Sequence, residues 1–274
     1  MRINTNVNSM RTQEYMRQNQ DKMNTAMNRL SSGKRINSAA DDAAGLAIAT
    51  RMRAKEGGLD VGARNTQDAM SALRTGDAAL GSVSNILLRM RDLATQASSS
   101  TNNSQDIASM DKEYQALGAE IDHIASKTNF NGNTFLNGAA GKDITVQLSD
   151  VSGDTMDIKA FDTSAKTTGT LQVGGAKKLD STTAATEITA LDTAIQEIAD
   201  ARATYGSQLN RLDHNLNNVT SQSTNMAAAA SQIEDADMAK EMSEMTKFKI
   251  LNDAGISMLS QANQTPQMVS KLLQ

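Results

Sequence analysis

The residue types that most often carry out acid–base or metal chemistry are scarce in this chain of 274 residues. It has two histidines, His123 and His214, and no cysteine. Each histidine directly follows an aspartate, but neighbouring residues on a helix point in different directions, so neither pair forms a catalytic dyad. The lack of cysteine excludes disulfides, thiolate catalysis and cysteine-ligated zinc. We therefore interpret both histidines as solvated surface residues.

The adjacent carboxylates Asp41 and Asp42 are the remaining candidates for a metal site. They stand directly before an expected helix, where an aspartate commonly caps the free backbone N–H groups and complements the helix dipole. We therefore favour a capping role over metal binding. The chain contains no GxSxG elbow, no Walker A loop, no GxGxxG and no HExxH pattern,. The sequence predicts neither an enzyme nor a bound cofactor.

Composition narrows the fold and the partners. Aromatic residues make up 3% of the chain, tryptophan is absent and there is one proline, Pro266. Few aromatics indicate a thin core, and the scarcity of proline permits very long helices. A net charge of −4 argues against nucleic acid as a partner,. The sequence has no run of 18 apolar residues, so no membrane span is predicted. The N-terminus lacks the apolar region of a cleaved secretory signal.

Two long apolar ladders with a 3.5-residue period dominate the pattern, one in the first third of the chain and one in the last. The first begins at Ile48 and runs to Ala97, and the second begins at Ile188 and runs to Met226. A ladder of this length is stable only against another helix. The sequence therefore predicts a mainly α fold, an elongated rod of long antiparallel helices with coiled-coil packing, plus a small β-hairpin region in the middle.

The expected helices follow from start and stop signals. Gly33 suits the position just after a helix end, and Ser104 is the expected N-cap of the third helix. We expect Pro266 to interrupt the last helix. Two interruptions of the second ladder fall at Arg202 and Ser223. The predicted helical segments are residues 1–32, 43–97, 104–128, 184–231 and a last segment that begins near residue 235.

Five glycines, Gly57, Gly58, Gly62, Gly76 and Gly81, fall inside the predicted helix 43–97. Each costs about 0.5–1 kcal/mol in a helix interior. Two interpretations stay open at this point. Either the helix is locally weak, or the glycines allow another part of the backbone to approach closely.

The segment 133–182 has a different period. Ile144, Val146 and Leu148 alternate with polar residues, and so do Met156, Ile158 and Ala160. The turn sequence Ser152-Gly153-Asp154 between these runs predicts a β-hairpin. Leu171 and Val173 suggest a further short strand. We expect this segment to be an exposed, variable lobe.

The two terminal segments carry weak, methionine-rich seams. Such segments are marginal when alone and become ordered only against partners. We therefore expect folding of the chain ends to be coupled to assembly. The predicted assembly seam comprises Ile3, Val7, Met10, Met23, Met27, Leu30, Met238, Met242, Met245, Phe248, Leu251 and Met258.

A series of motifs, in order and at both ends, resembles the bacterial flagellins. The resemblance covers about residues 1–135 and 185–274 and leaves only the middle lobe unmatched. The matching stretches are Met1-Arg2-Ile3-Asn4-Thr5-Asn6, Leu30-Ser31-Ser32-Gly33-Lys34-Arg35-Ile36-Asn37, Asp41-Asp42-Ala43-Ala44-Gly45-Leu46-Ala47-Ile48, Asn65-Thr66-Gln67-Asp68, Phe130-Asn131-Gly132, Asp235-Ala236-Asp237-Met238-Ala239-Lys240-Glu241-Met242 and Gln261-Ala262-Asn263-Gln264-Thr265-Pro266-Gln267.

The resemblance implies a subunit that polymerises with itself into the flagellar filament for swimming motility. It implies export of the unfolded chain through the flagellar type III apparatus, without signal cleavage, to an extracellular location. The implied domains are D0 (residues 1–42 and 232–274), D1 (43–132 and 183–231) and a small β-containing lobe of D1 (133–182). Implied partners are the filament cap, hook–filament junction proteins and an export chaperone at the C-terminal segment.

The resemblance also implies recognition by Toll-like receptor 5. The segment Leu88-Arg89-Met90-Arg91-Asp92-Leu93 is similar to the one through which many flagellins are detected, and the matching positions are Arg89, Leu93 and Glu113. Receptor-binding flagellins often carry glutamine where this chain has Leu88. Without the resemblance, the same residues describe an ordinary solvated helix face.

Two other functions compete with that of a filament subunit. A hook–filament junction protein shares the flagellin-like N-terminus, but the tail through Gln261-Ala262-Asn263-Gln264 to Pro266 favours a flagellin. A flagellin with a protease in its variable lobe is the other alternative. The lobe here has about fifty residues and no histidine, which is too little for such a domain.

Overall fold

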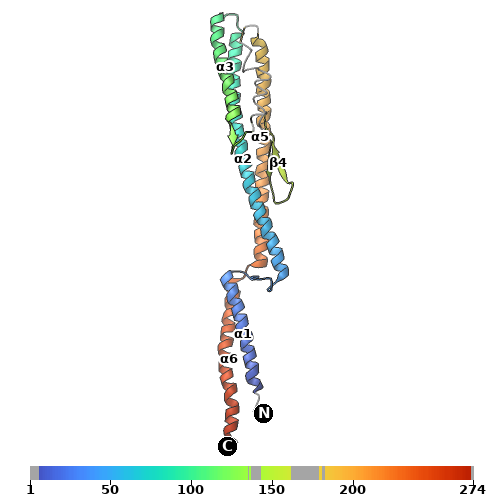
Figure 1. Cartoon of the computed structure of the whole chain (residues 1–274), viewed down its shortest axis with the longest axis vertical. Coiled ribbons are helices and arrows are strands. Elements are labelled where there is room, and N and C mark those ends of the chain that lie inside the picture. The colour runs from blue at the N-terminus through green and yellow to red at the C-terminus, as the bar shows by residue number, and fades with distance from the viewer. Residues whose placement is uncertain (1–5, 135, 137–142, 162–178, 181–182, 273–274) are drawn as a thin grey trace. The chain divides into compact units, whose positions relative to one another are not determined.

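The computed structural model describes residues 6–134, 136, 143–161, 179–180 and 183–272. Within them the chain is mainly α, as predicted, and it divides into two compact units. The terminal unit comprises the residues up to Glu56 and from Thr224, and the central unit comprises residues 57–223. The helices are α1 (Val7–Ser32), α2 (Ala43–Ala97), α3 (Ser104–Lys127), α5 (Ala184–Glu234) and α6 (Met238–Leu272) (Figure 1).

Helix α1 begins and ends at residues suited to these positions. The Asn6 side chain caps the N-terminus by accepting a hydrogen bond from the Ser9 amide. Gly33 follows the last helical residue with a φ of +70°, and its N–H donates to the Arg29 carbonyl over 2.9 Å. Only glycine adopts this left-handed conformation without steric cost, so the predicted stop at Gly33 is confirmed.

The caps of the next two helices partly match the prediction. Asp42 caps α2, because its Oδ1 accepts the Gly45 N–H over 2.9 Å. The cap of α3 is Asn103 and not Ser104. The Asn103 side chain accepts from two amides of the first turn, and Asp106 returns a bond to the Asn103 N–H. This reciprocal capping box satisfies more free N–H groups than a serine hydroxyl one residue later would.

The predicted interruption of the last helix at Pro266 is wrong, since α6 continues through it to Leu272. Proline has no N–H, so the carbonyl of Ala262, four residues earlier, loses its usual helical partner. The Asn6 side-chain amide donates to this carbonyl over 2.8 Å. A replacement donor from α1 thus satisfies the carbonyl that the proline leaves free.

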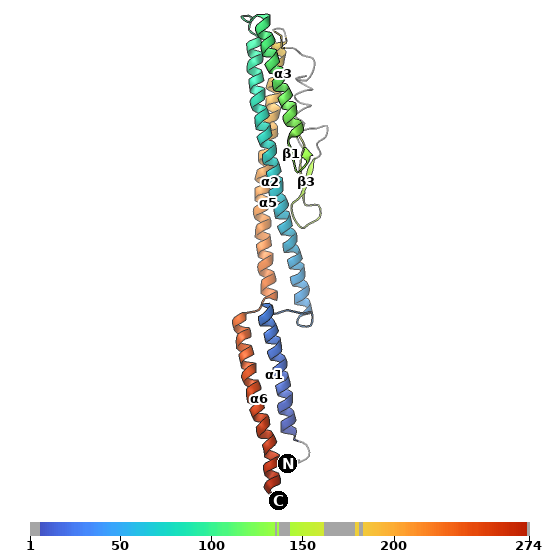
Figure 2. The same ribbon diagram turned by 60° about the vertical axis from the view of Figure 1, so that its left-hand side comes forward.

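The core of the central unit lies between α2, α3 and α5. Helices α2 and α5 lie side by side in both views (Figure 1, Figure 2). Their antiparallel pairing is confirmed by cross-helix contacts that include Arg91–Asp192 at 2.5 Å. Residues of both predicted ladders and of α3 fill the core with almost no exposure: Leu73, Leu80, Leu87, Met90, Ile121, Leu191, Ile198 and Leu212.

Both interruptions of the second ladder make polar contacts with α2. Arg202 Nε donates to Asp77 Oδ1 over 2.8 Å, and Ser223 Oγ donates to Asp60 Oδ1 over 2.7 Å. These positions therefore link the helices through their polar side chains, in place of apolar packing.

Two short antiparallel strand pairs accompany the helices. The pair β1 (Asn129–Phe130) and β2 (Asn133–Thr134) is joined by an Asn-Gly turn with positive φ at both residues,. The pair β3 (Ile144–Gln147) and β4 (Thr155–Ile158) forms the predicted hairpin, with Gly153 at a φ of +90° in the turn. The further strand predicted at Leu171 and Val173 lies outside the described residues.

The β3–β4 hairpin lies against the glycines of α2. A Cβ atom at Gly62 would be 2.6 Å from the Leu148 carbonyl oxygen, and one at Gly58 would be 2.7 Å from Asp150 Cβ. Apart from the helix's own nearby backbone, no described atom lies within 4 Å of the corresponding position at Gly57. The close-approach interpretation therefore holds for Gly58 and Gly62, and Gly57 has no such role.

Candidate assembly site: the paired terminal helices and their junction

Helices α1 and α6 pair along a single face of each helix (Figure 1). The half-buried or buried positions recur at alternating steps of three and four, which is the period of a coiled coil. On α1 they are Ser9, Thr12, Met16, Asn19, Met23, Ala26 and Leu30, and on α6 they are Glu241, Met245, Phe248, Asn252, Gly255, Leu259 and Ala262. We call these two rows the terminal seam.

The terminal seam is unusually polar. The Asn252 side-chain amide donates to Gln20 Oε1 over 2.8 Å, and Arg29 Nη1 lies 3.4 Å from Glu241 Oε1. The helices approach closely at Gly255, where a Cβ would lie 2.7 Å from Met16 Cγ. Small and polar residues thus replace most of the large apolar residues that a stable coiled coil needs.

Large apolar residues of the same two helices are exposed. Met258 is 68% exposed, and Met10 and Ile250 are each 60% exposed. We call this set, which is accessible in the isolated chain, the outer apolar faces. It comprises Val7, Met10, Tyr15 and Met27 on α1, and Met238, Met242, Ile250, Leu251, Ile256 and Met258 on α6.

The structure divides the residues predicted as one assembly seam into two groups. Half-buried positions in the terminal seam are occupied by Met23, Leu30, Met245 and Phe248. Exposed positions in the outer apolar faces are occupied by Val7, Met10, Met27, Met238, Met242, Leu251 and Met258. Ile3 lies outside the described residues.

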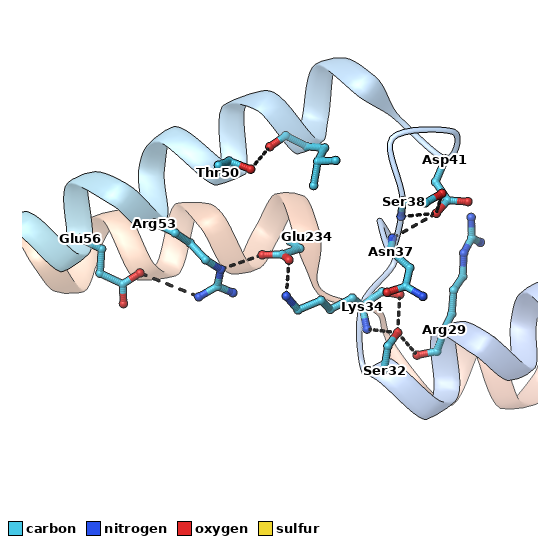
Figure 3. Close-up of polar contacts among 11 residues, drawn as sticks. Arg29, Ser32, Lys34, Asn37, Ser38, Asp41, Thr50, Arg53, Glu56 and Glu234 are labelled. Carbon is cyan, nitrogen blue, oxygen red and sulfur yellow. Dashed lines mark hydrogen bonds and ion pairs between the residues drawn. The ribbon is translucent and has the colours of Figure 1, made fainter.

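A charged cluster at the end of α5 links it to the linker after α1 and to the first part of α2. Glu234, the last residue of α5, is 6% exposed. Its carboxylate accepts a hydrogen bond from Lys34 Nζ and another from Arg53 Nε, the latter over 2.8 Å (Figure 3). These bonds, from Lys34 first and then Arg53, lower the pKa of Glu234 below its ordinary value of 4.5. Glu234 is therefore held as a charged group between two cations.

The backbone of the linker between α1 and α2 caps the end of α5. The N–H groups of Arg35 and Ile36 both donate to the Glu234 carbonyl, over 2.7 and 3.3 Å. The Arg35 guanidinium donates to the Ile233 carbonyl over 2.7 Å. The last carbonyls of a helix lack partners within it, so residues from the front of the chain supply them here. The positive charge of Arg35 also complements the helix dipole.

Asp41 folds the same linker. Its Oδ2 accepts the backbone N–H of Ser38 over 2.8 Å and that of Asn37 over 3.1 Å (Figure 3). These bonds, with Ser38 the larger contribution, lower the pKa of Asp41. Among the residues that the structure describes, no cluster of His, Asp or Glu could hold a metal ion. Asp41 and Asp42 act instead as a loop acceptor and a helix cap.

The residues implied in receptor recognition occupy two environments. Arg89 Nε donates to Glu113 Oε1 over 2.9 Å, and both side chains are about half exposed. Leu93 is 2% exposed and packs inside the central core. The structure thus brings Arg89 and Glu113 together on the surface of α2 and α3. His123 and His214 are both exposed, as predicted.

Several residues of this site do not stand out in the sequence. Lys34 and Glu234 lie 200 positions apart, and no periodicity links them. Asn252 falls in the terminal seam and Gln20 follows its residue Asn19, but neither is apolar, so neither belongs to an apolar ladder. One signal was available in Pro266, because a proline inside a helix requires another donor for the carbonyl four residues earlier. No helix in the described part of the chain is long and apolar enough to cross a membrane.

Both ends of the chain match known family profiles. Residues 3–140 match the profile described as "Bacterial flagellin N-terminal helical region", and residues 188–273 match "Bacterial flagellin C-terminal helical region". Curated relatives are similar over the whole chain. A flagellin of Listeria monocytogenes is 45% identical over 100% of this chain and 99% of its own length. A flagellin of Bacillus subtilis is 37% identical over 100% of both chains.

Solved structures are also similar. The crystal structure of Bacillus cereus flagellin is 70% identical, with a TM-score of 0.53, over 61% of this chain and 94% of that one. A putative flagellar hook-associated protein from Vibrio parahaemolyticus aligns with a TM-score of 0.59 over 71% of this chain and 100% of that one. At 14% identity this second likeness supports the fold alone.

Proposed function

The chain belongs to the bacterial flagellin family, and from this premise we propose that its outer apolar faces are the surfaces through which subunits assemble. Members of the family are structural subunits of the extracellular flagellar filament and not enzymes. The prediction of a self-assembling filament subunit, in preference to an enzyme, is thereby confirmed.

The observation that carries the proposal is the exposure of ten large apolar side chains in the described parts of α1 and α6. Single exposed apolar side chains are common on soluble proteins, but this many on two paired helices indicates surface that is used in protein–protein contacts. The terminal seam leaves these residues unburied, because it is made of other positions on the same helices. In a filament built from copies of one chain, the neighbouring copies are the partners that would cover these exposed residues.

We propose that folding of the terminal segments is coupled to this assembly. Helices α1 and α6 meet along a seam that contains Ser9, Thr12 and Asn252, which bury little apolar area,. A weakly packed pair of helices is marginal alone and gains stability when a further apolar surface is covered. In this proposal the D0 domain (residues 1–42 and 232–274) is only marginally stable in the isolated chain and becomes fully ordered on assembly. The helices of D1 (43–132 and 183–231, the domain to which the lobe 133–182 belongs) are already folded.

The proposal includes the route to the filament. A chain whose ends are weakly folded suits export in an unfolded state through the flagellar type III apparatus, without signal cleavage, for use in swimming motility. The exposed residues of α6, such as Ile250 and Leu251, suit an export chaperone that shields the C-terminal segment before assembly,. The filament cap and the hook–filament junction proteins are the further proposed partners.

The experiment that tests the assembly proposal is a charge substitution in the outer apolar faces. Leu251 is 41% exposed and lies outside the terminal seam, so Leu251→Asp should disturb the packing of the monomer little. We expect soluble protein that fails to form filaments in electron micrographs after seeding. Ser243→Asp adds the same charge at an exposed polar position of α6 and should leave polymerisation intact. Normal filaments from Leu251→Asp would refute the proposal.

A second function rests on the exposed ion pair of Arg89 and Glu113. Recognition by Toll-like receptor 5 needs accessible side chains on this face, and both residues meet that condition. Leu93 is buried, so its role here is to support the helix that carries Arg89. We expect Arg89→Ala to reduce receptor signalling by purified monomer at least several-fold. Unchanged signalling would remove this proposal without affecting the first.

A further inference from the structure

Asn6 uses both ends of its side-chain amide, one for each terminal helix. Its Oδ1 accepts the Ser9 N–H and caps α1. Its Nδ2 donates over 2.8 Å to the carbonyl of Ala262 on α6. That carbonyl is free because Pro266 has no N–H to donate to it. The carbonyls in the interior of a regular helix already accept a hydrogen bond from the N–H four residues later. Pro266 therefore leaves the Ala262 carbonyl available to a donor from outside α6, at one defined position along the helix.

A second amide contact lies further along the same pair of helices. Asn252 and Gln20 share a hydrogen bond of 2.8 Å, and both side chains are half-buried. In an apolar seam, neighbouring registers bury similar area and differ little in energy. A polar pair that is satisfied in only one register removes this ambiguity at some cost in stability.

We propose that these two amide contacts, Asn6 with Ala262 and Gln20 with Asn252, hold α1 and α6 in a single antiparallel register. The consequence for assembly rests on the proposed function, because the register decides which apolar residues of α1 and α6 stand at the same height. A slip of one heptad would shift the outer apolar faces by about 10 Å relative to each other. A neighbouring subunit would then meet a mismatched surface.

The register can be read directly by disulfide formation, since the chain has no cysteine of its own. The in-register reporter is Met16→Cys with Gly255→Cys, at the close approach where a Gly255 Cβ would lie 2.7 Å from Met16 Cγ. The off-register reporter is Met16→Cys with Ala262→Cys, which meet only after a slip of seven residues. Both full-length variants are oxidised as monomer and as filament. The intramolecular disulfide is then quantified on non-reducing gels and by peptide mass.

The test compares three backgrounds. With the natural amides, the in-register disulfide should dominate. With Gln20→Leu and Asn252→Leu, the ratio of off-register to in-register disulfide should rise about tenfold, as expected when hydrogen bonds of this kind no longer discriminate. The exchange Gln20→Asn with Asn252→Gln keeps an amide pair and should restore the original ratio. Gln13→Leu with Asn263→Leu adds equal apolarity at exposed positions and should not change it.

Pro266→Ala tests the other contact. The new N–H would bond to the Ala262 carbonyl within α6 and compete with Asn6. The off-register ratio should again rise, although alanine is the better helix former. A ratio that stays the same in both the leucine and the Pro266→Ala backgrounds would overturn the inference. This outcome is distinct from failure of the assembly proposal, because the disulfide ratio is read in the monomer whether or not filaments form.

Discussion

Arg53 and Glu234 form a charge-assisted hydrogen bond of 2.8 Å between the first part of α2 and the last residue of α5. Lys34 binds the other oxygen of the same carboxylate. Glu234 thus joins the linker after α1, the start of α2 and the end of α5 at one point (Figure 3). The residues before and after the central unit are tied to each other through this carboxylate.

We predict that Glu234→Ala destabilises the terminal unit by roughly 1–3 kcal/mol. It removes a buried acceptor shared by two cations, and hydrogen bonds to charged groups are worth about this amount. Chemical denaturation measures the change in the free energy of unfolding. Hydrogen exchange of the amides of residues 33–36 then shows whether the loss of protection lies at this junction. Glu56→Ala is the matched control, because Glu56 contacts the same Arg53 only at 3.9 Å. An equal loss in both variants would contradict a special role for Glu234.

We predict that acid weakens this junction. The pKa of Glu234 is lowered by Lys34 and Arg53, so its contribution to stability is fully present above its ordinary pKa of 4.5. It is lost as the pH falls through the lowered value, because the folded state must then bind a proton that it disfavours. The unfolding free energies of the wild type and of Glu234→Gln should therefore differ at pH 7 and converge in acid, once the pH has fallen below the lowered pKa of Glu234. A constant difference across this range would exclude the mechanism.

Two glycines of α2 should respond in opposite directions to alanine. Gly62→Ala places a methyl group against the Leu148 carbonyl, so the β3–β4 hairpin must move, at a cost of about 1–3 kcal/mol,. At Gly57→Ala the new methyl group has no described atom within 4 Å outside its own helix, and the change should stabilise the helix by about 0.5–1 kcal/mol,. Thermal unfolding of the two variants tests both signs. Stabilisation by Gly62→Ala would show that the hairpin yields freely.

The two buried tyrosines should also differ. Burial raises the pKa of Tyr205 to about 12, and its hydroxyl has no hydrogen-bond partner among the described residues. Tyr205→Phe should therefore be neutral or stabilising by up to about 1 kcal/mol, since it removes an unsatisfied polar group. The Tyr114 hydroxyl lies 3.4 Å from Glu187 Oε2, so Tyr114→Phe should cost about 1 kcal/mol,. Denaturant midpoints of the two variants, compared with wild type, decide the order.

Much of the fold follows from local pattern. The long ladders predicted the mainly α class, and the predicted helix 43–97 coincides with α2. Gly33 and Asp42 marked helix boundaries because their effects depend on a few neighbouring residues. The choice between Asn103 and Ser104 as the N-cap of α3 was wrong because both residue types are common at that position and the two stand next to each other in the sequence. Pro266 misled because the donor that compensates for it, Asn6, lies 256 positions away.

The assembly site was only partly accessible to sequence reasoning. Apolar spacing identified the methionines and leucines of the chain ends as surfaces that need partners, but it placed them in one seam. The structure assigns Met23 and Phe248 to the contact between α1 and α6, and leaves Met10 and Met258 exposed. Spacing reports which residues share a helix face. It does not report which face the partner within the same chain occupies.

The helical class, most helix boundaries and the family membership suggested by the motifs could be predicted from the residues alone, because periodicity and capping are short-range properties. Three contacts became visible only in the folded chain: the pairing of Glu234 with Lys34 and Arg53, the approach of Leu148 to Gly62, and the hydrogen bond from Asn6 to Ala262. Each of these joins residues far apart along the chain. Their proximity depends on how whole helices pack, and no local pattern encodes it.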